Sequence, residues 1–283
     1  MSAVSTAPAL SGVSFGGILR SELIKLTSLR STIWCYIILI VITIGLAPLL
    51  GLAFASQDMA SLGLGDAQNL TVQAITASIG FSQLVVSVLG ALVITGEYGT
   101  GMIRSTFTAV PKRLPALYGK AVVFGLTTFV IGFVALSLSL LVTTPVLAAG
   151  GIEVDLADGA LWLSVLGAAA YLALIGLLSL AIGAIIRNSA GGIATALGTI
   201  LVLPTILSVF VLITMADWLG NLNNVLPSNA GTQMFTYQSG DSAAADPFAT
   251  GTALEPWQGG LVLVLWVLVL GALASVLIKR RDA

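Results

Sequence analysis

The sequence predicts an all-α polytopic membrane protein, and three observations support this fold class. Of the 283 residues, 57% are hydrophobic and only 8% are charged, whereas soluble domains average about 25% charged residues. Uncharged runs long enough to cross a bilayer, which takes about 20 residues in a helix, recur along the chain. Every Lys and Arg falls in one alternate set of the connections between these runs. A soluble protein of this size is excluded, because it would need a far more charged surface.

The first 30 residues precede the predicted membrane domain. Residues 1–13 carry no charge and are rich in Ser, Ala, Thr and Pro, so we expect a disordered leader without the basic region of a secretory signal. Residues 14–30 are expected to form an N-terminal amphipathic helix in the membrane interface, too short and too charged to span. Its apolar face would consist of Phe15, Ile18, Leu19, Leu23, Leu26 and Leu29.

Residues 31–283 form the predicted six-span transmembrane domain. The spans are expected at about 31–55, 70–95, 121–149, 160–186, 190–216 and 257–278. All basic residues lie before the first span, in the connections after the second and fourth spans, and after the sixth. By the positive-inside rule both termini are cytosolic, in a multi-pass protein of the cell (plasma) membrane. The longest connections are a cytosolic loop at 96–120 and an external loop at 217–256, in which Pro227 could begin a short helix.

Several residue types and motifs are absent from the sequence, and their absence limits the reactions and binding sites that this chain could support. Histidine is absent, which removes histidine-based catalysis and histidine metal sites. No span has an ionisable residue near its centre, where ion-coupled transporters generally keep one. The chain also lacks the Gly-x-x-x-x-Gly-Lys-Ser/Thr loop that binds nucleotide phosphates. We therefore expect no catalytic, cofactor or metal site in this chain, and energy for transport would come from a separate ATPase.

A polar, basic stretch from Thr95 to Lys120 separates two long apolar runs. It reads Gly96-Glu97-Tyr98-Gly99-Thr100-Gly101-Met102-Ile103-Arg104-Ser105-Thr106, followed by Pro111-Lys112-Arg113 and then Lys120. This pattern resembles the cytosolic loop of the type-2 permease subunits of ATP-binding-cassette exporters. The layout of an interfacial helix, six spans, cytosolic termini and a larger external segment after span five is also similar to that family.

The resemblance implies a fold, partners and a site. Residues 97–108 would form a coupling helix that docks into a cleft on a cytosolic ABC ATPase, with Glu97 in its first turn. ATP and Mg would be bound by that partner, and a second permease subunit, identical or related, would complete the pathway for a hydrophobic or amphipathic substrate. No nucleic-acid partner is expected. The ATPase-binding residues would be Glu97, Tyr98, Thr100, Gly101, Arg104, Ser105 and Thr106. Alternatively, the basic residues of the loop only set topology and bind lipid phosphate.

Span two carries a stripe of small and polar residues at helical spacing. It consists of Gln73, Thr76, Gly80, Gln83, Ser87 and Gly90. Either this face packs against another helix through small residues and hydrogen bonds, or Gln73, Thr76, Gln83 and Ser87 line a translocation path.

A rival function from another class remains open. The external loop 217–256 contains acidic residues that could serve as metal ligands or acid/base groups of a self-contained membrane enzyme or sensor. They are Asp217, Asp241, Asp246 and Glu255. Their irregular spacing favours solvated loop charge over such a site.

Overall fold

The fold is described from a computed structural model, which describes residues 14–56, 63–109, 113–238, 252 and 254–280. The expected leader, 1–13, lies outside these ranges. Within them every regular element is a helix. The helices are α1 (Phe15–Ser28), α2 (Arg30–Ala55), α3 (Leu64–Thr76), α4 (Ile79–Thr100), α5 (Met102–Ala109), α6 (Leu114–Ala149), α7 (Gly159–Ile186), α8 (Ser189–Leu197), η1 (Gly198–Val202), α9 (Leu203–Thr214), α10 (Asp217–Asn224), α11 (Pro227–Thr232), η2 (Gln233–Phe235) and α12 (Pro256–Arg280).

In the described part of the chain, six helical stretches are long and apolar enough to cross a membrane, as the sequence predicts. Three are single helices of 25 to 28 residues, α2, α7 and α12, and the 36-residue α6 is the fourth. At 1.5 Å per residue, α6 is about 54 Å long and extends well beyond the roughly 30 Å hydrocarbon core. The other two stretches are interrupted, α3 with α4 and α8 with η1 and α9.

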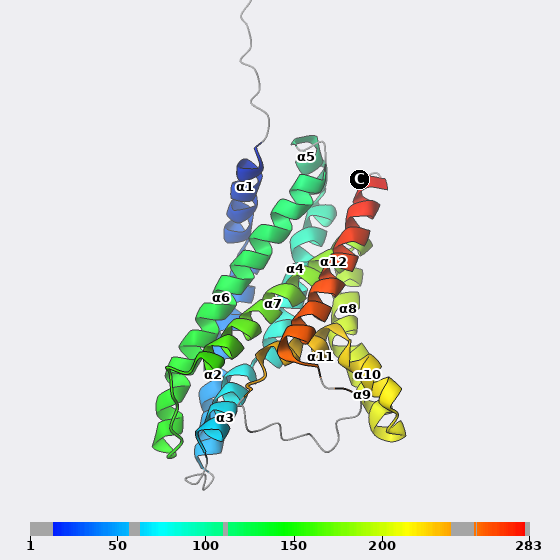
Figure 1. Ribbon diagram of the computed structural model, residues 1–283. Coiled ribbons are helices and arrows are strands. Elements are labelled where there is room, and N and C mark those ends of the chain that lie inside the picture. Colours follow the sequence, from blue (N-terminus) through cyan, green and yellow to red (C-terminus); the bar gives the residue numbers. More distant parts are fainter. Residues whose placement is uncertain (1–13, 57–62, 110–112, 239–251, 253, 281–283) are drawn as a thin grey trace, which may run out of the picture.

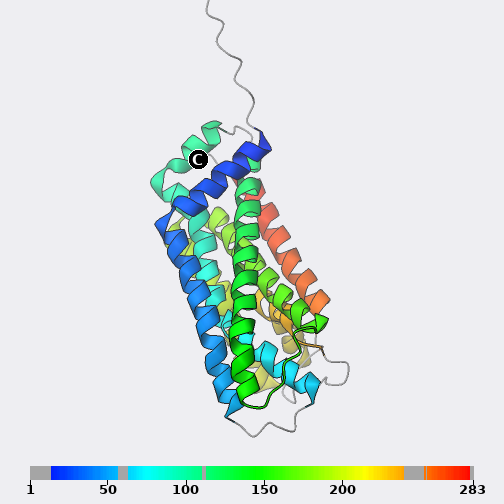
Figure 2. The same cartoon turned by 90° about the vertical axis from the view of Figure 1, so that its left-hand side faces the viewer.

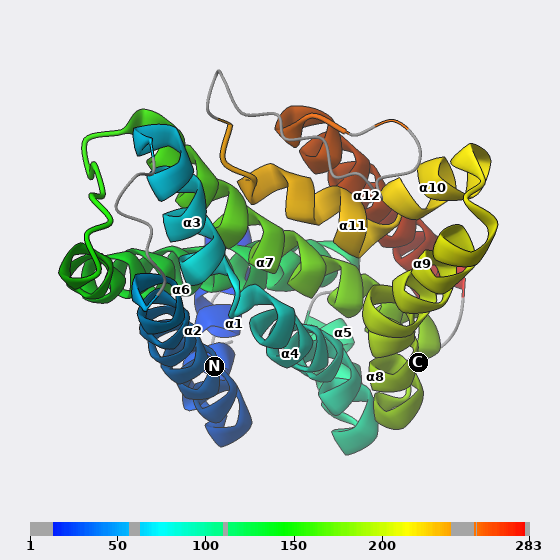
Figure 3. The ribbon, with the colours of Figure 1, turned by 90° about the horizontal axis from the view of Figure 1, so that it is seen from below.

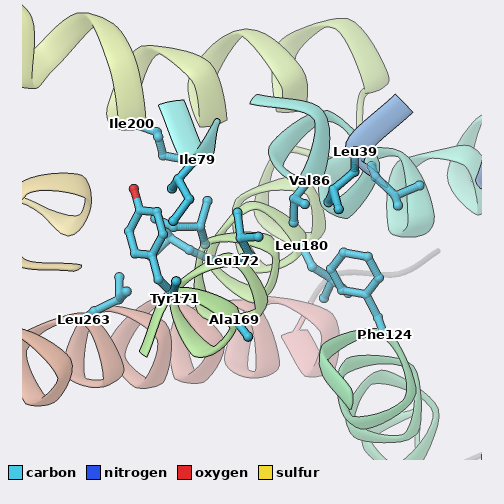
Figure 4. Close-up of a cluster of buried hydrophobic side chains, with 14 of the residues drawn as sticks. Leu39, Ile79, Val86, Phe124, Ala169, Tyr171, Leu172, Leu180, Ile200 and Leu263 are labelled. Atoms are coloured by element: carbon cyan, nitrogen blue, oxygen red, sulfur yellow. The ribbon is translucent and has the colours of Figure 1, made fainter. Parts of the chain in front are cut away.

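Helix α7 forms the centre of the bundle. In its most apolar window 72% of residues are buried, against 17% for the α8–α9 stretch and 22% for α2 and α12. A helix that is hydrophobic on all sides is expected in the interior, and α7 packs against α4, α6 and α12. Its side chains Ala169, Tyr171 and Leu172 lie among residues of α4, η1 and α12 in the core (Figure 4). The peripheral spans leave their apolar faces exposed.

Helices α4 and α7 approach closely at glycines. A Cβ atom added to Gly90 of α4 would lie 2.3 Å from the carbonyl oxygen of Gly176 on α7. One added to Gly183 of α7 would lie 3.0 Å from the carbonyl oxygen of Ala91. Small residues at such crossings let membrane helices pack backbone to backbone. Close packing against α7 therefore explains why the predicted small-residue stripe has glycine at position 90.

Span two is predicted as one helix over 70–95, and the structure differs from this prediction. The chain forms two helices that meet at Ala77 and Ser78, and the second continues to Thr100. The hydroxyls of Thr76 and Ser78 bond to backbone carbonyls three or four residues back, a type of bond that bends helices. Span five is similarly irregular. The π-helix η1 ends at Val202, and the second residue of the following helix α9 is Pro204, which has no N–H to donate to the helix ladder.

The segment after span five enters the bundle. As predicted, Pro227 opens a short helix at its first position. This helix and η2 lie against α7 and α12, seen from below in Figure 3. A Cβ atom on Gly167 of α7 would lie 1.9 Å from the carbonyl oxygen of Met234, and one on Gly259 would lie 2.2 Å from that of Ala230. Two glycines therefore create the space that this segment fills.

The two ends of the bundle differ in charge. Helices α1 and α5 and the end of α12 lie together at one end, and α3, α10 and α11 lie at the other (Figures 1 and 2). We call the first the basic end, because all described Lys and Arg residues belong to it: Arg20, Lys25, Arg30, Arg104, Arg113, Lys120, Arg187, Lys279 and Arg280. The described residues of the opposite connections carry only acidic charge, from Asp66, Glu153, Asp155, Asp158, Asp217 and Glu255.

Candidate functional site

Four charged side chains from three helices form a buried charge cluster at the basic end. Its members are Glu22 and Lys25 of α1, Glu97 of α4 and Lys120 of α6. Lys120 Nζ donates to Glu22 Oε2 at 2.5 Å and to Glu97 Oε1 at 2.9 Å. Lys25 Nζ donates to Glu22 Oε1 at 2.7 Å and to Glu97 Oε1 at 2.9 Å. The charge cluster therefore joins α1, α4 and α6 and is neutral overall.

Burial makes this cluster energetically important. Glu22, Glu97 and Lys120 are each at most 4% exposed, and charges removed from water are stable only when they are paired. Glu97 Oε2 is buried and has no hydrogen-bond partner within the described structure. Replacement of either lysine would leave buried carboxylate charge with too little compensation, so the cluster fixes the positions of three helices.

Lys25 is the most exposed member of the charge cluster. Burial lowers the pKa of its ammonium group, but its hydrogen bonds to Glu22 and Glu97 and their negative charges outweigh that effect, and the pKa is raised above 10.5. Because the folded-state pKa of Lys25 is raised, the contribution of this side chain to the free energy of unfolding is fully present below its unfolded-state pKa. It is lost only as the pH rises through the folded-state value. Lys25 therefore stays charged throughout the physiological range.

The position of Glu97 corrects one prediction. The resemblance to the permease family predicts Glu97 in the first turn of a coupling helix over 97–108. In the structure it lies in the last turn of α4, which ends at Thr100 with Gly101 as its cap at a φ of 74°. A glycine in this left-handed conformation is a common helix terminator. The carboxylate of Glu97 thus lies near the negative end of the α4 dipole, where the two lysines compensate it.

Helix α5 is a separate eight-residue helix that begins at Met102. Ile103 is buried, whereas Met102, Ser105 and Thr108 are exposed. Ser105 Oγ donates to its own helix, at the carbonyl oxygen of Met102, over 2.8 Å. The side chains of the predicted site residues Arg104 and Thr106 lie outside the described part of the structure. Thr100 is also exposed, and its hydroxyl bonds to the carbonyl oxygen of Gly96.

The predicted apolar face of α1 is divided in the structure. Ile18 and Leu26 are buried against the bundle, with Glu22 between them. On α6, a Cβ atom on Gly119 would lie 2.7 Å from Ile18 Cγ2, so α1 packs closely there. The other apolar residues are at least partly exposed: Phe15, Leu19, Leu23 and Leu29. Helix α1 therefore docks on the protein through a stripe that includes a charged residue, which the hydrophobic pattern did not reveal.

Two arginines join other elements to the end of α12. Arg113 Nη1 donates to the carbonyl oxygen of Ile278 at 3.3 Å, and Arg187 Nη2 donates to that of Leu277 at 3.2 Å. Carbonyls in the last turn of a helix lack intrahelical partners. The Arg187 guanidinium also lies 5.3 Å from the ring centroid of Tyr98. No sequence feature next to Arg187 indicates these contacts.

The residues of the predicted translocation path have different surroundings. Ser87 is buried beside α7, and its hydroxyl donates to the carbonyl oxygen of Gln83 at 2.5 Å. The Gln83 side chain accepts a hydrogen bond from Tyr171. Gln73 is exposed and donates to Asn69 Oδ1 at 3.3 Å, and Thr76 is half-buried. The break between Thr76 and Ile79 places Gln73 and Thr76 on α3 and Gln83 and Ser87 on α4, and the translocation path stays a prediction.

The acidic residues of the rival site are only partly described. Asp217 begins α10, and Glu255 directly precedes α12 and accepts a hydrogen bond from Trp257. Asp241 and Asp246 lie outside the described residues. Within the described residues, no three His, Cys, Asp or Glu side chains come together in a group that could hold a metal ion.

Comparisons with models of protein families and with curated proteins found no match. The function must therefore be inferred from the residues and their arrangement. The six long apolar helical stretches indicate a multi-pass membrane protein, and its described residues place the short helix α5 and a buried charge cluster at the basic end.

Proposed function

We propose that the protein is the membrane-spanning permease subunit of an ATP-driven ABC exporter, without an ATPase site of its own. One observation carries the proposal: a short helix at the basic end, α5, follows directly from span two, and the last turn of that span is fixed to α1 and α6 by the charge cluster. A partner that moved α5 would therefore move three helices together, which suits a coupling element.

The partner's contribution follows from this arrangement. A cytosolic ATPase, which binds ATP and Mg, would hold α5 in a groove on its surface. The partner would contact the side of α5 on which Met102, Ser105 and Thr108 are exposed to solvent. Glu97, by contrast, would act from inside the charge cluster as a positioning residue. The exposed apolar side chains of α1, including Phe15 and Leu23, would lie in the membrane interface.

Translocation would require a second permease subunit. The α8–α9 stretch is only 17% buried in its most apolar window, so its exposed face would be covered by lipid or by a second subunit. The central parts of the spans carry no Asp, Glu, Lys, Arg or His side chain, and this favours a hydrophobic or amphipathic substrate over a strongly ionic one. The protein would lie in the plasma membrane, with both termini in the cytosol.

Orientation can be tested with two serines at opposite ends. Ser105 and Ser56 are both exposed, and each hydroxyl donates at 2.8 Å to the carbonyl three residues earlier. In a Cys35→Ala background, Ser105→Cys should react with a membrane-impermeant maleimide only after the cells are opened. Ser56→Cys should react in intact cells. The reverse labelling pattern would contradict cytosolic placement of the basic end.

Coupling between the protein and an ATPase can be tested at the same two positions, Ser105 and Ser56. In affinity purification of the tagged full-length protein from its native membrane, a soluble ATPase is expected to co-purify. Ser105→Arg should reduce its recovery at least about tenfold, because a long charged side chain in a docked groove creates a clash and an unpaired charge. Ser56→Arg should leave recovery unchanged. If no ATPase is recovered with the unaltered chain while other membrane complexes survive, the exporter proposal is wrong.

A further inference from the structure

Helix α10 has an exposed apolar side. Trp218 and Leu222, which are one turn apart, are 67% and 49% exposed, and Val225, directly after the helix, is 43% exposed. At 100° per residue, the three side chains lie within about 80° of one another around the helix axis. Gly220, on the opposite side, is buried. Helix α10 therefore packs on the protein through its glycine side and presents its apolar side outward, at the edge of the bundle in Figure 3.

Helix α10 runs back alongside α9. The two helices are separated by two residues along the chain. Asn223 Nδ2, near the end of α10, donates to Ser208 Oγ in the middle of α9 at 3.1 Å. Beyond α10, the indole N–H of Trp266 in α12 donates to the carbonyl oxygen of Val225 at 3.0 Å. The C-terminal end of α10 therefore lies beside the inner turns of α9 and α12 and not beyond their ends.

These contacts place α10 in the leaflet opposite to the basic end. Trp266 precedes Lys279, which marks the basic end of α12, by 13 residues, or about 20 Å along a helix. The hydrocarbon core is about 30 Å thick, so its midplane is about 15 Å from either boundary. Val225 therefore lies beyond the midplane, in the hydrocarbon of the opposite leaflet. Trp218, seven residues earlier, is about 10 Å farther out, at the boundary where tryptophan is enriched.

The backbone at the end of α10 is satisfied by side chains. The last carbonyl groups of a helix lack intrahelical partners, and in hydrocarbon no water is present to supply them. Here Trp266 Nε1 donates to the carbonyl oxygen of Val225, and Asn229 Nδ2 donates to that of Asn223 at 3.0 Å. This end of the helix is therefore suited to a dry environment.

Hydrogen bonds also fix the rotation of α10 about its own axis. Asn221 Oδ1 accepts from the backbone N–H and the hydroxyl of Thr252, at 2.8 and 2.9 Å. Asn224 Nδ2 donates to the carbonyl oxygen of Thr252 at 3.1 Å. The polar side chains are thereby bound to the chain, and the apolar side keeps its outward direction. Among the described elements, α9 packs against η1 and α10, so α10 supports the outer half of span five.

We propose that the apolar side of α10 is a lipid-contact surface in the leaflet opposite to the basic end, with acyl chains packed on Leu222 and Val225 and the Trp218 ring among the headgroups. By itself this side is too small for a stable protein partner, because an eight-residue helix is about 12 Å long and such an interface takes about 800 Å² from each partner. The lipid contact holds the outer half of span five in place. It does not depend on the exporter function.

Spin-label accessibility in phospholipid nanodiscs tests this proposal. The full-length protein, in a Cys35→Ala background, carries one label at a time at Leu222→Cys, Val225→Cys or Asp217→Cys. Oxygen concentrates in hydrocarbon, whereas a polar nickel chelate stays in water. We expect the labels at 222 and 225 to collide more often with oxygen than with nickel. Asp217, exposed at the start of α10, should show the reverse, and Leu268→Cys, 61% exposed on α12, is the lipid-facing reference.

Two substitutions at one position show whether the apolar side holds α10 in the lipid. With the label at Val225→Cys, Leu222→Asp should replace the oxygen preference by a nickel preference, because a carboxylate is unstable in hydrocarbon. Leu222→Ala keeps the side apolar and should leave the oxygen preference in place. If Leu222→Asp does not fold, the three labelled variants decide the question alone.

Three results would contradict the proposal. A nickel preference at both Leu222→Cys and Val225→Cys would show that this side of α10 faces water. Low accessibility to both reagents would show that protein covers it, and dipolar broadening between labels would identify that protein as a second copy of the chain. An equal response to Leu222→Asp and Leu222→Ala would show that the apolar character of the side does not hold α10. These measurements involve no ATPase and are independent of the exporter proposal.

Discussion

Lys120→Met is expected to lower the free energy of unfolding by about 3–5 kcal/mol, the typical cost of removing one partner from a buried ion pair. Lys120 donates to both carboxylates of the charge cluster and is only 4% exposed. Without it, Glu22 and Glu97 share the single charge of Lys25. Equilibrium unfolding in mixed detergent micelles, followed by tryptophan fluorescence, measures the change.

Three further variants decide whether the loss arises from unpaired charge. Arg30→Met removes an exposed cation and should change the free energy of unfolding by no more than about 0.5 kcal/mol. Glu97→Gln combined with Lys120→Met should be less destabilising than the sum of the two single changes, because the double variant removes both charges of one contact. Strict additivity would show that the cluster does not act as a unit.

The same cluster determines which variants can test coupling. Glu97→Arg would place a third cation beside Lys25 and Lys120 in a buried site, so we expect loss of folded protein and not a selective loss of transport. Substitutions on the exposed surface of α5, such as Ser105→Arg, avoid this problem because they leave the cluster intact.

Gly90→Ala is expected to be the most damaging single methyl addition in α4. Its Cβ atom would lie 2.3 Å from the Gly176 carbonyl oxygen, which is backbone and can move only with α7. Overpacking of a core typically costs about 1–3 kcal/mol, and we expect a value at or above the upper limit here. Equilibrium unfolding followed by tryptophan fluorescence measures this change. If the destabilisation is large enough, no folded protein is obtained on expression.

Gly80→Ala, in the same helix, is the matched control. A Cβ atom there meets nothing within 4 Å, and alanine is favoured over glycine in helices by about 1 kcal/mol. This variant should therefore be as stable as the unaltered protein or slightly more stable. Equal destabilisation by Gly80→Ala and Gly90→Ala would mean that the close α4–α7 crossing is not what makes glycine necessary at Gly90.

The sequence alone determined the membrane class, the six helical stretches and the helix opened by Pro227. These features depend on local properties: the hydropathy of a run of about 20 residues and the conformational restriction of proline. The concentration of basic residues at one end was also visible, because it needs only their order relative to the spans.

Only the tertiary structure decided how the helices of the basic end are joined. Two of the ion pairs of the charge cluster join residues 72 and 98 positions apart, Lys25 with Glu97 and Glu22 with Lys120. Hydrophobic periodicity cannot reveal such pairs, because a charged residue on a docked helix face looks the same in sequence as one in water. For the same reason the sequence predicts Glu97 in a different helix from the one that contains it, and no sequence feature next to Arg187 indicates its contacts with α12 and Tyr98. Their surroundings come from helices that meet only when the bundle is packed.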